Sequence, residues 1–278
     1  MDVKKNIIEY LEREGFPFEM QVSQIFQKEG FSVNSSVYLE DVNSHKSREI
    51  DVICYKGKLV NKYVIFDIKF IVECKYSKLS PWIMFRADSD KSKAVKHDAM
   101  FRSATEIGKI ALLEIENTAS NKDNYLFEVP NNLFYGVRCI TKNKNNHSEI
   151  DRSDVPYQAI MQVCNGVASS IKYLEEKFNN NFISRLEIYF PLIIVDGPLF
   201  ECYLGETSEI IVNEIEQGII KMEQPNLSND KYYIRVISSK AMIKIIQNLS
   251  QSCNELLTDF DDKIPNTIAF INNKNKHS

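Results

Sequence analysis

The stretch VIFDIKFIVECKY, residues 64–76, has the most regular pattern in the chain. Its even-numbered positions are all apolar or aromatic, and its odd-numbered positions include four charged residues: Asp67, Lys69, Glu73 and Lys75. Because side chains alternate between the two faces of a strand, the pattern predicts a long strand with one buried face. Glu73 and Lys75 then project from the same face, where an acid beside a lysine is typical of sites that bind a metal and a water.

A further carboxylate lies in the preceding segment REIDVICY, residues 48–55, which also alternates. The pattern predicts a strand with Ile50, Val52 and Cys54 on one face and Asp51 on the other. If the two strands form an antiparallel hairpin in which Asp51 faces Glu73, its midpoint is residue 62, at the end of the polar run 60–62. This run is a suitable turn, so the two carboxylates are expected to face each other.

Paired carboxylates repel each other unless a cation lies between them. Their hard oxygen atoms favour Mg²⁺ or Mn²⁺ over zinc. Lys75 beside such an ion could orient a water or stabilise negative charge on a phosphate. Asp51 and Glu73 are therefore predicted as metal ligands.

Glu19 is a third carboxylate in an unexpected place. A helix is predicted from Pro17 to about Glu29, with Gly30 as its C-terminal cap. Glu19 lies in line with the apolar stripe of that helix, three residues before Val22 and seven before Phe26. A glutamate on the inward stripe is expected to have a partner inside the fold.

The same strand contains a rival pair, Asp67 and Lys69, with the same acid-x-lysine spacing on the same face. Pairing Asp51 with Asp67 would move the midpoint of the hairpin to residue 59, where the turn chemistry is poorer. The sequence therefore favours Glu73 and Lys75 but leaves the rival pair open. Each carboxylate alone would also be explained as an ordinary hydrogen-bonded or exposed residue.

Composition narrows the class of protein. The chain has 278 residues, 44% hydrophobic and 26% charged, with a net charge of −4, so any attraction to nucleic acid must be local. The six cysteines form no C-x-x-C pair and the four histidines form no cluster, which argues against zinc and predicts buried thiols. No phosphate-binding glycine loop and no G-x-S-x-G elbow is present. With no apolar run long enough to span a bilayer, a cytoplasmic protein is expected.

The rest of the chain predicts one α/β domain with a mixed central sheet flanked by helices. An amphipathic N-terminal helix has Val3, Ile7 and Leu11 along one face. Further helices are expected over 96–116, 154–178, the middle of 206–230, and 241–260. Further strands are expected over 31–39, 134–140 and 232–238, with a hairpin of 186–195 and 199–204 around the turn 196–197.

Glu19, the segment 48–53 (REIDVI) and the segment 70–75 (FIVECK) together resemble the PD-(D/E)xK, restriction-endonuclease-like nuclease superfamily. The resemblance implies a nuclease-like domain over 1–205, with core motifs in 17–76 completed by 134–178, and a C-terminal extension over 206–278 packed on the same domain. Two departures are that Ile50, not proline, precedes Asp51, and that the long interval to Glu73 requires an extended hairpin.

The resemblance also implies roles for individual residues. Asp51, Glu73 and the backbone carbonyl of Cys74 would bind Mg²⁺ or Mn²⁺, and Lys75 would position the attacking water. Glu19 would hold a second metal or a water on the metal. In some branches a glutamine of the later core helix reaches the site, and the candidates for substrate binding are Gln158 and Gln162.

The function expected from this resemblance is Mg²⁺-dependent hydrolysis of DNA, by an endonuclease in restriction or anti-phage defence. Expected partners are DNA and a second copy of the chain or a protein of the same defence system, without a membrane. The alternative expectation is a catalytically silent subunit with the nuclease fold, which binds nucleic acid or a partner protein.

Overall fold

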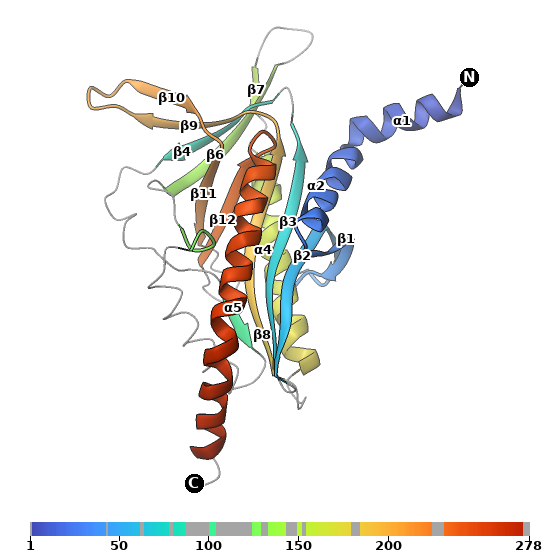
Figure 1. Cartoon of the computed structure of the whole chain (residues 1–278). Helices are drawn as coiled ribbons and strands as arrows, with labels where there is room; N and C mark the ends of the chain where they lie inside the picture. The colour runs from blue at the N-terminus through green and yellow to red at the C-terminus, as the bar shows by residue number, and fades with distance from the viewer. Residues whose placement is uncertain are drawn as a thin grey trace.

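The computed structural model describes residues 2–42, 44–61, 64–77, 80–86, 100–103, 124–128, 133–142, 149–151, 154–178, 184–223 and 231–274 (Figure 1). Its helices are α1 (Val3–Glu14), α2 (Phe16–Lys28), α4 (Asp154–Phe178) and α5 (Met242–Lys274). Its first strands are β1 (Ser32–Glu40), β2 (Ser47–Asn61), β3 (Val64–Tyr76), β4 (Trp82–Arg86), β5 (Met100–Ser103) and β6 (Leu133–Lys142). The later strands are β7 (Glu149–Asp151), β8 (Ser184–Asp196), β9 (Leu199–Leu204), β10 (Ile210–Glu214), β11 (Gln217–Glu223) and β12 (Lys231–Ser238).

The β2–β3 hairpin has the register that the sequence predicts. The two strands pair antiparallel from Val52 opposite Val72 to Leu59 opposite Ile65, with an irregularity between Leu59 and Asn61. This register has its midpoint at residue 62. Continued by one position, it brings Asp51 opposite Glu73.

The strands form one mixed sheet, as expected for the fold class. The order along its main path is β1-β2-β3-β8-β12-β11-β6-β4-β9-β10, with β5 paired to β8 and β7 paired to β6. β8 runs parallel to both β3 and β12, whereas β2 runs antiparallel to its two neighbours, β1 and β3. Segment 206–278, expected as an extension, thus contributes β12 to the interior of the sheet.

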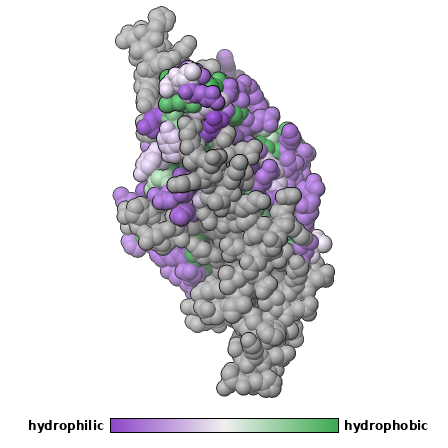
Figure 2. Space-filling view, turned by 90° about the vertical axis from the view of Figure 1, so that its left-hand side faces the viewer, coloured by the Kyte–Doolittle hydropathy of each residue, from purple (hydrophilic) through white to green (hydrophobic). Residues whose placement is uncertain are grey.

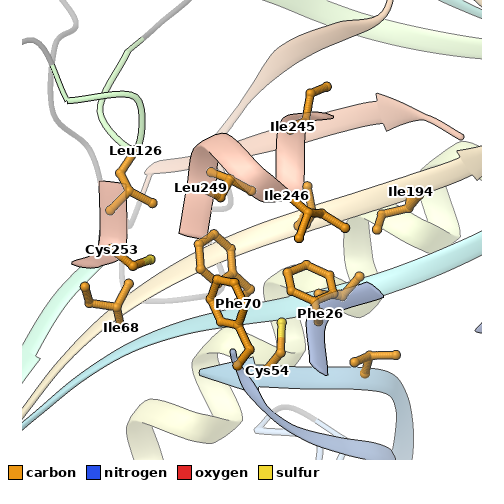
Figure 3. Close-up of a cluster of buried hydrophobic side chains, with 14 of the residues drawn as sticks. Phe26, Cys54, Ile68, Phe70, Leu126, Ile194, Ile245, Ile246, Leu249 and Cys253 are labelled. Carbon is orange, nitrogen blue, oxygen red and sulfur yellow. The ribbon is translucent and has the colours of Figure 1, made fainter. Parts of the chain in front are cut away.

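Helices cover both faces of the sheet. α5 crosses the near face in Figure 1 and α4 lies behind the strands. One apolar cluster joins α2 and α5 to the sheet, with Phe26, Phe70, Ile246 and Leu249 among its members (Figure 3). Phe70 lies at its centre, with ring centroids 5.7 Å from Phe31 and 5.3 Å from Phe190. The second cluster joins α4 to the opposite face.

The strand around Asp51 differs from simple alternation. Ile50 belongs to the α4 cluster, whereas Val52 and Cys54 belong to the α2–α5 cluster, so the expectation of a single shared face was wrong. Ser36 on β1 falls opposite Asp51 in the register and has φ of +51°, in the left-handed region. The local change of direction allows neighbouring apolar residues to reach different cores.

Three expectations for secondary structure need correction. β8 and β9 do not form a hairpin, because both neighbours of β8 are already β3 and β12, and β9 pairs with β4 and β10. The segment 206–230 contains strands β10 and β11 rather than a helix; β10 includes the run Ile-Ile-Val and β11 the pair Ile-Ile, and these β-branched residues favour strands. Within the expected helix 96–116, residues 100–103 form β5, and the other positions lie outside the described residues.

The described part of the surface is mostly polar, as is usual for a globular protein. Among the residues that carry a hydropathy colour in Figure 2, most are hydrophilic, with small hydrophobic patches mainly in the upper half of the view. Five of the six cysteines are buried and all six are free, as expected. Among the described residues, no helix combines the length and apolar character that crossing a membrane requires.

Gly166 lets α4 approach the sheet closely, and this contact gives a first prediction. A Cβ at Gly166 would lie 2.7 Å from Ile71 Cγ2 and 2.8 Å from Ile50 Cδ1. We expect Gly166→Ala to lower the free energy of unfolding in a urea titration. The packing penalty is about 1–3 kcal/mol, partly offset by a gain of up to about 1 kcal/mol in helix propensity.

Gly136→Ala is the matched control, because the nearest atom to its new Cβ is Phe85 Cδ2 at an ordinary 3.7 Å. We expect this control to change the free energy of unfolding by about 0.5 kcal/mol or less. Equal effects of the two substitutions would contradict close packing of α4 on the sheet.

Candidate active site

Glu73 and Lys75 form a direct ion pair near the end of β3. Lys75 Nζ lies 2.5 Å from Glu73 Oε1. The Glu73 side chain is only 1% exposed, and its other oxygen, Oε2, is buried without a hydrogen-bond partner among the described residues. A buried polar atom without a partner carries a large desolvation penalty, so this oxygen is a natural place for a ligand.

Asp51 joins the same site from the neighbouring strand. The backbone N–H of Cys74 donates a hydrogen bond of 2.7 Å to Asp51 Oδ2. This bond replaces the strand pairing, which ends at Val52 and Val72. The Cys74 thiol itself is buried in the α2–α5 cluster, so the residue contributes to the site through its backbone.

Of the two glutamines expected near the site, the structure brings Gln162 to it. Lys75 Nζ donates to Gln162 Oε1 over 3.3 Å, and the Gln162 side chain is half-buried. Gln158 lies one turn earlier on α4 and is exposed. Lys75 is thus held between an acid on its own strand and an amide on the covering helix.

Glu19 approaches the other carboxylates from α2. Its side chain is half-buried. Burial raises the pKa of Glu19 to about 7, and the negative charges of Asp51 and Glu49 add to the effect, while Lys75 opposes it. The expected inward glutamate is therefore within electrostatic reach of the site.

Burial and neighbouring charges also act on the carboxyl groups of Asp51 and Glu73. Burial raises the pKa of Glu73 to about 8, and the charge of Asp51 raises it further against the opposing charge of Lys75. Burial also raises the pKa of Asp51, although the Cys74 N–H and Lys75 favour its ionised form. Three acids that each resist ionisation in one place are typical of functional sites.

The donor set has the chemistry of a site for a divalent cation. It offers hard carboxylate oxygens from Glu19, Asp51 and Glu73, one of them buried without a partner. As they stand, however, no three His, Cys, Asp or Glu side chains of the described part of the chain are grouped to hold a metal. One Asp51 oxygen accepts from the Cys74 backbone and one Glu73 oxygen accepts from Lys75, so part of the donor set is already engaged in hydrogen bonds.

The rival pair has a different setting. Asp67 falls opposite Gly57, not Asp51, and accepts two hydrogen bonds from Arg185, of 2.8 and 3.0 Å. Lys69 Nζ lies 2.7 Å from Glu187, which also binds Arg185 and the Tyr189 hydroxyl. Asp67 and Lys69 are therefore members of a buried ion network between β3 and β8.

Sequence reasoning missed the contacts that hold α4 beside the hairpin. Asp41, buried after β1, accepts a hydrogen bond of 3.2 Å from Arg48 Nε and one of 3.0 Å from Asn165 Nδ2. Asn165 lies three residues after Gln162, almost one turn further along α4. The segment EDVNSHKSR, residues 40–48, has the charges for such a link, but the sequence does not indicate which helix would receive it.

Comparison with protein-family models, with curated proteins and with solved structures found no match to this chain. The resemblance to PD-(D/E)xK nucleases therefore rests on the motif residues themselves. The structure brings Glu19, Asp51, Glu73, Lys75 and Gln162 into one site, and leaves Gln158 on the exposed side of α4.

The raised pKa values predict how stability depends on pH in the metal-free protein. Because Glu73 titrates near 8 when folded but near 4.5 in its ordinary state, the folded form binds more protons between these values. The free energy of unfolding should therefore fall as pH rises from about 5 to about 8. We expect urea titrations in EDTA to show this decline, and Glu73→Gln to reduce it.

Glu223→Gln is the matched control, since Glu223 is exposed and a hydrogen bond from Lys221 lowers its pKa. Its contribution is lost only as pH falls below the ordinary value, so this control should leave the slope between pH 5 and 8 unchanged. A stability that is flat or rising over this range in the wild type would contradict the crowding of carboxylates at the site.

Proposed function

We propose that this chain is a Mg²⁺-dependent endonuclease that hydrolyses DNA phosphodiester bonds, with a role in restriction or anti-phage defence. The observation that carries the proposal is the buried Glu73 carboxylate, which has one oxygen on Lys75 and the other without a partner in the described part of the chain. Burial raises the pKa of Glu73, and Asp51 and Glu19 add to the effect, so a bound cation would favour the ionised form of this carboxyl. The restriction-endonuclease-like fold is part of this proposal.

The residues suit hydrolysis of a phosphodiester. Asp51, Glu73 and Glu19 would hold Mg²⁺ or Mn²⁺, with the Cys74 backbone carbonyl as a further ligand. Such an ion, when bound, neutralises charge on the phosphate and acidifies water. In the overall reaction water adds to phosphorus, one phosphorus–oxygen bond to a sugar breaks, and the released sugar oxygen takes up a proton.

Lys75 would act on the substrate side of this reaction. Its ammonium group is fixed by Glu73 at 2.5 Å and by Gln162 at 3.3 Å, so its donors have a defined direction. From there it would orient the attacking water or donate to a phosphate oxygen as negative charge develops. Gln162 would position Lys75 rather than react, and Gln158 remains a candidate for contacts with DNA from the exposed side of α4.

A catalytically silent subunit with this fold is the second candidate. The observation in its favour is that no three potential ligands are grouped for a metal in the described part of the chain. In such a subunit the Glu73–Lys75 ion pair would be purely structural, and the protein would bind nucleic acid or a partner without cutting. Cleavage assays separate the two candidates.

Lys75→Ala should reduce cleavage of plasmid DNA in Mg²⁺ by at least about 100-fold, because the fixed ammonium group is lost. Lys69→Ala is the matched control, since it removes the same kind of side chain six residues earlier in β3 and leaves Glu187 paired with Arg185 and Tyr189. We expect this control to keep activity. If Lys69→Ala lost cleavage and Lys75→Ala did not, the active pair would be Asp67 and Lys69 instead of Glu73 and Lys75. If the wild type did not cleave DNA, the result would favour the silent subunit.

Mg²⁺ should raise the melting temperature of the wild type at pH 8, because a ligand at 100 times its dissociation constant adds about 2.7 kcal/mol of stability. The increase should shrink at pH 6, where Glu73 is protonated. It should be lost in Asp51→Asn and Glu73→Gln, and retained in Glu49→Gln, which alters an exposed acid beside Asp51. An unchanged increase in Glu73→Gln would refute the ligand assignment.

A further inference from the structure

The N-terminal helix α1 extends away from the rest of the molecule (Figure 1). All twelve of its residues are described, and none of them is buried. Asp2 caps the helix by accepting from the N–H groups of Lys4 and Lys5, and Gly15 ends it with φ of +89°. The helix is well formed at both ends and yet makes no core contact.

Its exposed side chains are nevertheless apolar along one side. The exposed fractions are 68% for Val3, 52% for Ile7 and 37% for Leu11. These residues are spaced by four and therefore lie on one face, which Tyr10 widens. We call these four residues the α1 stripe.

A short helix with such a stripe needs a partner. Isolated helices of about 12 residues are only marginally stable in water, and most helices gain their stability by packing an apolar face. A contiguous exposed apolar surface on a folded protein is typical of an interaction site. The α1 stripe is therefore an unoccupied docking surface in the single chain.

We propose that the α1 stripe packs antiparallel against the α1 stripe of a second copy of this chain, as a symmetric dimer. Val3 and Leu11 lie at equal distances from Ile7 along the helix, so an antiparallel pair brings Ile7 to Ile7 of the second copy and Val3 to Leu11 of the second copy. Such a contact uses the same surface on both partners, which is the rule for twofold dimers.

The charges of α1 favour this occupant and this direction. The first half of the helix carries Lys4 and Lys5, and the second half carries three glutamates, Glu9, Glu12 and Glu14, against one arginine. An antiparallel pair brings the basic half of one copy beside the acidic half of the other, whereas a parallel pair would bring like charges together. With three basic and three acidic residues, the helix also lacks the excess of lysine and arginine that an anionic membrane selects.

The stripe is connected to the candidate active site. A Cβ at Gly15 would lie 3.1 Å from Cβ of Tyr76, which follows Lys75 at the end of β3. The exposed α2 residues Phe16 and Met20 continue the apolar surface beyond the end of α1. A dimer built on α1 would therefore relate the two candidate sites by one twofold axis. The dimer would form whether or not these sites are catalytically active.

Sedimentation velocity over a concentration series tests the dimer. Two helices of this length bury less surface than a standard interface, so we expect a reversible, concentration-dependent dimer of the wild type. Ile7→Glu should raise the dissociation constant by at least about 30-fold, because it removes the central contact from both copies at once. Lys5→Gln, which lowers the net charge by the same amount at an exposed position opposite the stripe, should weaken the dimer far less.

Both variants should keep the melting temperature of the monomer, because no residue of α1 is buried. A wild type that stays monomeric throughout the series would overturn the proposal. A dimer that survives Ile7→Glu would do the same, as would binding of wild type to anionic vesicles that Ile7→Glu abolishes.

Oxidative cross-linking tests the direction of the pair. In the antiparallel arrangement the two Val3 residues are separated by about 12 Å, since each residue adds about 1.5 Å along a helix. Val3→Cys protein alone should therefore not cross-link through position 3, whereas a mixture of Val3→Cys and Leu11→Cys proteins should form a disulfide between them. The wild type reports any background from its own cysteines. Cross-linking of Val3→Cys with itself, or none in the mixture, would overturn the antiparallel pair.

Discussion

The antiparallel register of β2 and β3 is the constraint on which the candidate site depends. Side chains alternate along a strand, so a slip of one residue would send Glu73 and Lys75 into the α2–α5 core. Phe70 and Val72 prevent this slip because they are buried in that core, while Ile71 is buried under α4. With both faces of β3 covered, the ion pair has one possible position, and Asp51 is held beside it.

Burial has a second consequence, because it acts on the charges that the register brings together. Glu73 and Asp51 both lose solvation, which raises the pKa of each carboxyl, and the charge of Asp51 raises the pKa of Glu73 further. Lys75 compensates only part of this, since one Glu73 oxygen has no partner. The fold thus keeps a cluster of buried acids whose charges are only partly compensated, which supports the cation site that we propose.

The local patterns predicted the strands near the site well and the distant connections poorly. β3 has the limits that alternation predicts, and the register of the hairpin follows from the position of a polar turn. The pairing of β8 with β3 and β12 could not be predicted, because both faces of β8 are buried and its apolar run does not reveal which strands lie beside it. The turn at Asp196 and Gly197 is present in the chain, but β9 continues to another part of the sheet.

The two acid-x-lysine pairs of β3 show why the candidate site could be found only in part from the sequence. Asp67 and Lys69 have the same spacing and the same face as Glu73 and Lys75, so the difference between them comes from their neighbours. Beside Asp67 and Lys69, β8 supplies Arg185 and Glu187, which neutralise both charges of the pair. Beside Glu73 and Lys75, β8 supplies the apolar residues Ile193 and Val195. Among the described residues, the only polar contact from α4 to this pair is made by Gln162. Glu73 therefore keeps a buried side-chain oxygen without a hydrogen-bond partner among the described residues, whereas Asp67 does not. The spacing of residues defines which side chains share a face of a strand. The chemistry of the adjacent strand then decides whether these side chains form a structural ion network or leave a polar atom available to a ligand.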